Sequence, residues 1–337
     1  MSQKIIVLNI LLSLLITVSC NKPDDSLAQN ESPIDLKGIN ANYISNVSYD
    51  VYNETKFDIW MPESQNPTGL LIYIHGGGFT DGDKSVVYKK DKWDFPSEIR
   101  NLLTNDIAVA SINYRLLIKN GEDKGIIKCL YDSRRALQYI RYKADTYNID
   151  KTKIVLSGTS AGAGTALWIG VNDDFKDILS YDSVLHESTR VAGIVLRETQ
   201  STYNIEDKWI NNVFADYGIS WDAFLSANEE RIFQLYGVSN LVEYESAETD
   251  TYRSRVDMIE FFTNDDPEIW AENILTNVKE PTTSGIANHH AYHVREIKEK
   301  ADLVGIKNVC YYGKNPVIYS DASGESYTDF IIRKINE

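Results

Sequence analysis

The sequence predicts an α/β fold: a mostly parallel central sheet, helices on both faces of that sheet, and a small cap insertion. Short runs rich in β-branched and aromatic residues alternate with longer helical patterns, as they do in chains that form parallel sheets. The chain has 337 residues, enough for one large domain. Hydrophobic residues make up 43% of it and aromatic residues 11%, so a sizeable packed core can form.

Apolar runs and their spacing predict the individual elements. The predicted strands are 47–52, 56–61, 70–74, 108–113, 153–157, 191–196, 256–262 and 308–312. Helical periodicity predicts helices at 127–147, 163–171, 291–303 and 327–335. Residues 205–250 interrupt the alternation with helical or irregular patterns that contain Trp and Glu. We interpret 205–250 as a cap inserted over the sheet.

Residues 1–19 have the features of an export signal. Lys4 precedes an apolar run, 5–18, that is too short to span a bilayer comfortably. The segment ends in Ser19-Cys20 and resembles a bacterial lipoprotein signal, in which Cys20 would carry the lipid. Ordinary secretion with Cys20 removed is the alternative. We expect a lipid-anchored flexible tether at 20–45, a folded domain at 46–337, and an exported protein anchored to a bacterial membrane, in the periplasm or at the cell surface.

The charge of the chain limits its partners. The formal net charge is −15 and the isoelectric point is about 4.8, which excludes nucleic acid because its phosphates would be repelled. The same charge disfavours anionic membranes, so we expect membrane contact only through the lipid anchor. A small-molecule or carbohydrate substrate fits this balance. No Rossmann fingerprint or P-loop is present, so no nucleotide cofactor is expected. The pairing of Cys129 and Cys310 stays open.

The segment VLSGTSAGAGTALW carries the strongest chemical signal. An apolar strand runs into Gly158-Thr159-Ser160-Ala161-Gly162, and a helical pattern follows. This is the G-x-S-x-G arrangement in the strand–turn–helix context that it requires. Its glycines permit a sharp turn, which places Ser160 at the tip, next to a helix N-terminus where negative charge is favoured. The sequence therefore predicts Ser160 as a nucleophile.

A second motif, His75-Gly76-Gly77-Gly78-Phe79, ends the predicted strand 70–74. Consecutive glycines let backbone N–H groups point into a site as an oxyanion hole. Together the two motifs resemble the α/β-hydrolases of the hormone-sensitive-lipase and carboxylesterase type, over about residues 46 to 335. The resemblance implies oxyanion donors at Gly77, Gly78 and Ala161, and a structural role for His75.

The acid of the expected triad should follow a late strand, in the chain order serine, acid, histidine. Asp265 and Asp266 follow the predicted strand 256–262. The family commonly has its acid just before a proline, so Asp266, which precedes Pro267, is the predicted acid. A simple Asp-Pro turn is one alternative. Glu198, at the end of the predicted strand 191–196, is another.

The base is harder to place, because no histidine follows His293. The family normally carries it after the final strand, where this chain reads GKNPVIYSDASGES. Three histidines instead cluster at 289, 290 and 293: the first two come just before the predicted helix 291–303, and the third lies about a turn into it. We predict His290, nearest the helix start, as the base, with His289 as the alternate and His293 facing solvent. His289 and His290 could also merely cap the helix.

Two functions compete at this point. The first is a serine esterase that hydrolyses small acyl esters, including esters on carbohydrates, through an acyl-enzyme on Ser160. The second is a non-catalytic hydrolase-like protein that binds glycans or peptides, suggested by the missing C-terminal histidine. A peptidase on the same fold is a third. The spacing of His289 and His293 could suggest zinc, but no H-E-x-x-H motif accompanies it, so no metal is expected.

Overall fold

The structure, a computed structural model, describes residues 30–275 and 279–337. The predicted signal segment and Cys20 lie outside the described residues, so anchoring stays a prediction. The described strands form one sheet in the order β1-β2-β4-β3-β5-β6-β7-β8-β9. They are β1 (Ala41–Ser48), β2 (Lys56–Pro62), β3 (Thr68–Ile74), β4 (Ile107–Ile112), β5 (Ile149–Thr159), β6 (Gly193–Arg197), β7 (Glu268–Asn273), β8 (Asn308–Tyr312) and β9 (Tyr319–Ser320).

The direction of the strands decides where a site can form. Strands β3 to β8 run parallel, whereas β1, β2 and β9 pair antiparallel with their neighbours. The carboxyl ends of β3, β5, β6, β7 and β8 therefore lie along one edge of the sheet. Open α/β sheets bind their ligands at that edge.

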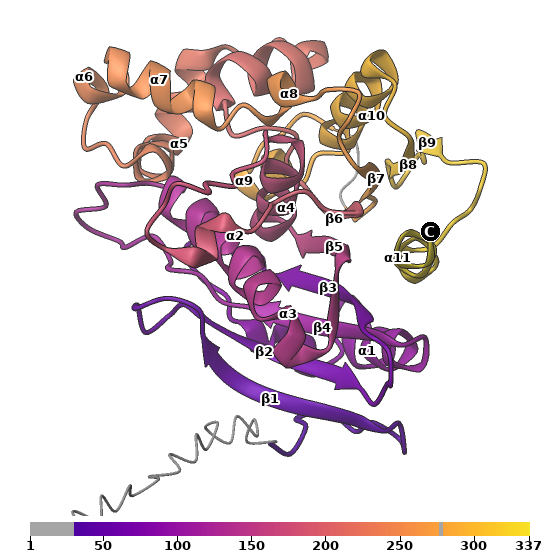
Figure 1. Cartoon of the computed structure of the whole chain (residues 1–337). Helices are drawn as coiled ribbons and strands as arrows, with labels where there is room; N and C mark the ends of the chain where they lie inside the picture. Colours follow the sequence, from indigo (N-terminus) through magenta and orange to yellow (C-terminus); the bar gives the residue numbers. More distant parts are fainter. Residues whose placement is uncertain (1–29, 276–278) are drawn as a thin grey trace, which may run out of the picture.

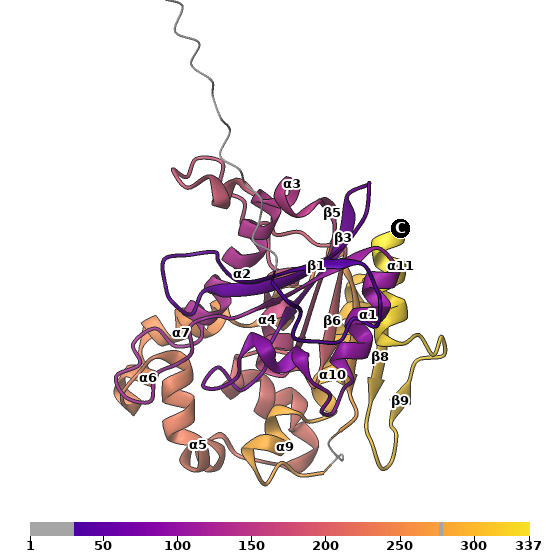
Figure 2. The same cartoon turned by 90° about the horizontal axis from the view of Figure 1, so that it is seen from below.

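Helices cover both faces of the sheet, as the sequence predicts. Figure 2 shows α1 (Phe95–Thr104) and α11 (Tyr327–Asn336) together on one side, with α2 (Ile127–Tyr142) and α4 (Ala161–Val171) on the other. Helix α10 (Tyr292–Val304) packs on the same face as α2 and α4. Each face has its own apolar core. Other short helical segments before and after the central strands are η1 (Lys84–Tyr88), α3 (Ala144–Tyr147), η2 (Ser183–His186) and α9 (Ser284–Asn288).

The composition of the central elements explains their burial. Strands β3, β4 and β6 are buried at every residue, which is typical of parallel strands covered on both faces. Helix α4, with the sequence AGAGTALWIGV, is also buried along its whole length. Its small residues allow it to approach the strands closely.

Two strand predictions are wrong. The run 47–52 is mainly a turn, and the edge strand β1 lies earlier in the chain. The run 256–262 is not a strand: it contains the short helix α8 (Met258–Phe261), whose apolar side chains are buried against the core. The strand that occupies this place in the sheet is β7, EIWAEN. Its two glutamates interrupt the apolar pattern, so the sequence does not predict a strand there. Short apolar runs do not distinguish strand from helix by periodicity alone.

Helical segments fill the chain between β6 and β7, where the sequence predicts a cap. They form a group on one side of the molecule in Figure 1. Their bounds are η3 (Ile205–Val213, π-helical), η4 (Ala215–Tyr217), α5 (Trp221–Tyr236), α6 (Leu241–Tyr244), α7 (Ala247–Arg255) and α8. We call this group the helical insert. Its role in selecting substrates stays a prediction.

Two further observations concern the described residues. No helix among them is both long and apolar enough to cross a membrane. Cys129 and Cys310 are buried free thiols.

We expect Gly162→Ala to destabilise the fold. A Cβ at position 162 would lie 2.0 Å from the carbonyl oxygen of Ile74, a backbone atom that cannot move aside cheaply. Overpacking of this kind costs about 1–3 kcal/mol or more. Urea denaturation should show this loss. Gly285→Ala is the matched control, because its new Cβ would meet only Thr283 Oγ1 at 3.9 Å. Equal stability of the two variants would contradict this account of the close approach.

Candidate active site

Ser160 occupies a strained turn between β5 and α4. Its φ of 54° and ψ of −123° lie where a residue with a side chain rarely falls, so neighbours must hold it there. Its N–H donates to the carbonyl oxygen of Arg197 at 2.9 Å, which ties the turn to the end of β6. Gly162 packs against the end of β3. The hydroxyl of Ser160 is thus presented at the carboxyl edge of the sheet, at the N-terminus of α4.

The glycine loop after β3 lies against this turn. Gly77 and Gly78 have positive φ values of 102° and 59°. A Cβ on Gly77 would come 1.9 Å from the carbonyl oxygen of Asp81, so only glycine fits there. Among the described residues, the N–H groups of Gly77 and Gly78 donate to no acceptor. They are therefore free to bind a ligand oxygen.

His75 anchors the start of this loop. Its ring stacks on Tyr114 with centroids 4.4 Å apart, and its Nδ1 lies 2.7 Å from the carbonyl oxygen of Gly76. The hydroxyl of Tyr114 donates to the carbonyl oxygen of His75 at 2.9 Å. Burial lowers the pKa of His75. Its side chain holds the loop in place, in keeping with the structural role that the resemblance implies.

His289 is the imidazole that the structure brings to Ser160. Its Nε2 lies 2.8 Å from the Ser160 Oγ, within the range of a hydrogen bond between a nucleophile and its base. Burial, with a smaller contribution from the charge of Lys92, lowers the pKa of His289 to about 4. The ring is therefore neutral at pH 7 and can accept the hydroxyl proton.

Side-chain amides fix the backbone on both sides of His289. Gln200 Nε2 donates to the carbonyl oxygen of Asn288 at 2.7 Å, and Asn273 Nδ2 donates to that of His290 at 3.0 Å. Gln200 lies just after β6, and the fully buried Asn273 ends β7. His289 itself ends the short helix α9. The ends of two central strands thus position this ring.

The other two histidines do not reach Ser160, so the preference for His290 over His289 is corrected. His290 is fully buried, with its Nε2 3.1 Å from the Tyr217 hydroxyl and 3.2 Å from the Lys279 carbonyl oxygen. His293 is fully buried as well, not solvent-facing. Its Nδ1 accepts from the N–H of Ser201, and its Nε2 lies 3.0 Å from the carbonyl oxygen of Ala287. Both rings brace the backbone around His289.

Asp266 lies at the wrong end of a strand to serve as the acid. It precedes β7, whereas Ser160 lies at the carboxyl edge. Its carboxylate accepts from Arg190 Nη1 at 3.1 Å and from the N–H of Thr263 at 2.8 Å. The error follows from the strand wrongly predicted at 256–262. Asp266 comes after that run, but the real strand, β7, begins only at Glu268, so Asp266 lies before a strand and not after one. Asp266 belongs to a loop on the opposite edge.

Glu198 is the carboxylate that the fold places beside the site. It directly follows β6 with a φ of 51°, and its neighbour Arg197 bonds to Ser160. Its Oε1 accepts from the N–H groups of Ile274 and Leu275, both at 3.0 Å. Its Oε2 is buried without a partner among the described residues. Burial raises the pKa of Glu198 to about 7. In the described part of the chain no acceptor bonds to His289 Nδ1.

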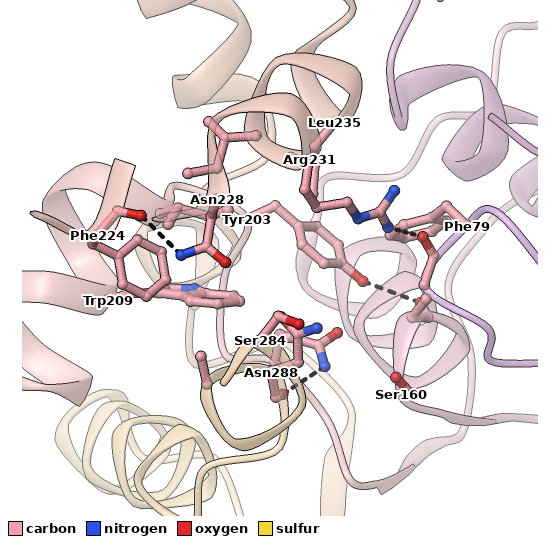
Figure 3. A pocket seen from close by; sticks show the side chains of 16 residues that line it. Phe79, Ser160, Tyr203, Trp209, Phe224, Asn228, Arg231, Leu235, Ser284 and Asn288 are labelled. Carbon is pink, nitrogen blue, oxygen red and sulfur yellow. Dashed lines mark hydrogen bonds between the residues drawn. The ribbon is translucent and has the colours of Figure 1, made fainter. Parts of the chain in front are cut away.

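A cavity of about 130 Å³ opens at Ser160. Figure 3 shows its wall, in which Tyr203, Trp209 and Phe224 surround an apolar space and Asn228 points into it. Asn228 and Arg231 come from α5, so the helical insert forms one wall. The sequence analysis missed both residues. Their spacing, with Phe224 and Leu235, follows one face of a helix, but nothing in that pattern shows what the face covers.

The described residues contain no group of three or more His, Cys, Asp or Glu side chains that could hold a metal ion. The rings of His289 and His293 instead make the separate contacts given above.

Comparisons with known proteins identify the family of this chain. The BD-FAE family model matches residues 57–268, which include both motifs. Cholinesterase 1 of Branchiostoma lanceolatum is 29% identical over 142 residues, covering 40% of this chain and 37% of its own length. Chlorogenic acid esterase of Aspergillus niger is 33% identical over 129 residues, covering 34% of this chain and 24% of its own length. The chain spans less than half the length of these curated relatives.

A solved structure gives the same fold. A truncated form of a carbohydrate esterase from gut microbiota superposes with a TM-score of 0.58 at 19% identity, covering 88% of this chain and 96% of that one. The comparison supports the predicted architecture, a mostly parallel sheet with helices on both faces.

We expect Ser160 to react with a fluorophosphonate probe in a manner that depends on His289. The neutral imidazole 2.8 Å from Oγ would take the hydroxyl proton, so His289→Gln should slow labelling by roughly 100-fold or more. His186→Gln is the matched control, since the His186 ring bonds to the carbonyl oxygen of Ser180 instead, and circular dichroism should confirm that both variants are folded. Labelling of the His289 variant at the same rate as the control would contradict the assignment.

Proposed function

We infer that this chain, which belongs to the BD-FAE family, is a serine esterase. The observation that carries this proposal is the contact of 2.8 Å between Ser160 Oγ and His289 Nε2, at a strained turn beside the glycine loop. A nucleophile paired with a neutral base, next to free backbone donors, is the arrangement required for acyl transfer. The esterases among the relatives support it.

The mechanism follows from these positions. Ser160 Oγ attacks the ester carbonyl carbon while His289 Nε2 takes the hydroxyl proton. The N–H groups of Gly77, Gly78 and Ala161 stabilise the oxygen that becomes negative. The imidazolium then gives its proton to the leaving alcohol, and an acyl-enzyme remains. Water attacks this intermediate by the same route, which releases the acid and restores Ser160.

Glu198 is our candidate for the acid that supports His289. Gln200 and Asn273 fix the backbone around His289 to the segment that follows β6, which begins with Glu198. Asn273 Nδ2 also donates to the carbonyl oxygen of Thr199 at 2.9 Å. Glu198 Oε2, buried without a partner in the described part of the chain, follows a strand end that pairs with the one before Ser160. The chain order serine, acid, histidine is kept, with the acid after β6.

The size of the cavity bears on the acyl group. About 130 Å³ is well below the roughly 300–1,000 Å³ of pockets that enclose drug-sized ligands. Short acyl groups such as acetyl fit this space better than long chains. The carbohydrate esterase with the same fold favours acylated carbohydrates as the substrate class. Aromatic and amide side chains that line the cavity, Trp209 and Asn228 among them, suit a sugar.

We expect the purified protein to hydrolyse p-nitrophenyl acetate, with kcat/KM falling as the acyl chain lengthens from acetate to octanoate. Ser160→Ala should lower kcat by roughly 10⁴-fold or more, because among the described residues only the Ser160 hydroxyl bonds to the His289 ring. The release of p-nitrophenol measures both the dependence on chain length and the loss of kcat. Binding of an acetylated oligosaccharide without any hydrolysis would instead favour the non-catalytic glycan-binding function.

We expect two rising limbs in the pH dependence of kcat/KM. Raising the pH first deprotonates His289, whose pKa is about 4, and then ionises Glu198, whose pKa is about 7. Each step favours proton transfer, the second by stabilising the imidazolium that forms.

Glu198→Gln should remove the limb near pH 7 and lower the plateau by roughly 100-fold, as loss of a triad acid does. Glu272→Gln is the matched control, since Glu272 is a neighbouring carboxylate that pairs with Arg197 instead. An unchanged limb near pH 7 in the Glu198 variant would show that Glu198 does not support the base.

A further inference from the structure

Arg231 occupies the neck of the cavity at Ser160. Together with Asn228 and Ser284, it lines both the inner cavity and an outer depression of about 550 Å³. A substrate whose acyl group lies in the inner cavity can therefore place its alcohol part next to these three residues. Figure 3 shows the guanidinium of Arg231 directed toward Phe79 and the glycine loop.

The charge of Arg231 has no acidic partner among the described residues. Its Nη1 donates to Gln234 Oε1 at 2.8 Å, and its Nη2 donates to the carbonyl oxygen of Gly78. No carboxylate in the described part of the chain lies within 4.0 Å of it. Burial lowers the pKa of Arg231, so the surroundings do not offset the cost of this charge. A charge that is removed from water is usually paired.

Other arginines of this chain show the contrast. Arg197, also partly enclosed, pairs with the carboxylates of Glu98 and Glu272. Arg141 is buried without an acid, but its guanidinium bonds to backbone carbonyls and lines none of the cavities at the site. Arg231 differs from both, because it is an unpaired cation that faces the path of a substrate.

The acidic side chains near Arg231 lie in the outer depression, farther from Ser160 than the neck of the cavity. Glu229 and Glu230 precede Arg231 on α5, line the outer depression and are exposed, so water and salt screen their charge. Arg231 is less exposed, and its field acts at the neck. An anionic group is thus favoured at the neck and disfavoured in the outer depression.

We propose that Arg231 binds a carboxylate on the alcohol part of the ester, so that the site prefers acylated uronic-acid units to their neutral counterparts. The inference rests on the proposed esterase function. A guanidinium presents its N–H groups as a fork that matches a carboxylate, and such charge-assisted pairs are stronger than neutral hydrogen bonds. The planar group at the neck would also orient the sugar as its acyl group enters the cavity.

The test compares acetate release from the acetylated methyl glycosides of galacturonic acid and galactose. The wild-type protein should favour the acid by roughly ten- to a hundredfold in kcat/KM, the range expected for a hydrogen bond to a charged group. Arg231→Gln should abolish this preference, and Arg231→Lys, which keeps the charge, should retain part of it. Arg100→Gln, on α1, gives the same change in net charge and should keep the preference.

Two results would overturn the proposal. One is the absence of a preference in the wild-type protein. The other is an equal loss on both sugars in Arg231→Gln, which would make Arg231 only a support for Gly78. Failure of the esterase function is measured separately, by p-nitrophenyl acetate. In that case calorimetry with Ser160→Ala decides: the acidic sugar should bind at least tenfold more weakly once Arg231→Gln is added, and equal binding would refute the role of Arg231.

Discussion

The close approach of α4 to the ends of the central strands is the constraint on which the site depends. Gly162 leaves no room for a side chain against β3, and the N–H of Ser160 bonds to the last residue of β6. These contacts hold Ser160 in a backbone conformation that it would not adopt alone. The free energy of packing in the core therefore maintains a locally unfavourable turn, and the hydroxyl keeps one position relative to the sheet.

The position of His289, the proposed base, depends on the same sheet through different contacts. His289 does not belong to a strand end, but Gln200 and Asn273 connect its neighbours to β6 and β7. His290 and His293 are buried beneath it. The crowding of histidines in one hexapeptide thus has a physical explanation: one ring faces the nucleophile, and the other two satisfy buried polar groups that keep the short helix α9 in place.

Much of the fold was predictable because its strands are strongly apolar and its two motifs require a strand, a turn and a helix. The position of β7 was not predictable, since its glutamates interrupt the apolar pattern and the apolar run before it folds as a helix. That single error moved the predicted acid to the wrong edge of the sheet. The choice between His289 and His290 was also beyond the sequence, because adjacent residues point in different directions and only the folded backbone decides which one meets Ser160. No sequence pattern predicted that Arg231 lines the site, since Gly78 and Ser160, which lie near it in the fold, are distant in the chain.

His289, the proposed base, precedes α10, and this has a consequence for the other end of the chain. In the described structure the segment after β8, residues 313–326, carries a small hairpin with β9 and supplies nothing that contacts Ser160. Val317, at its tip, is 63% exposed. Surface loops with exposed tips tolerate insertions well. This segment is therefore a natural place to lengthen the chain, attach a label or join a second domain, because the proposed site takes no side chain from it.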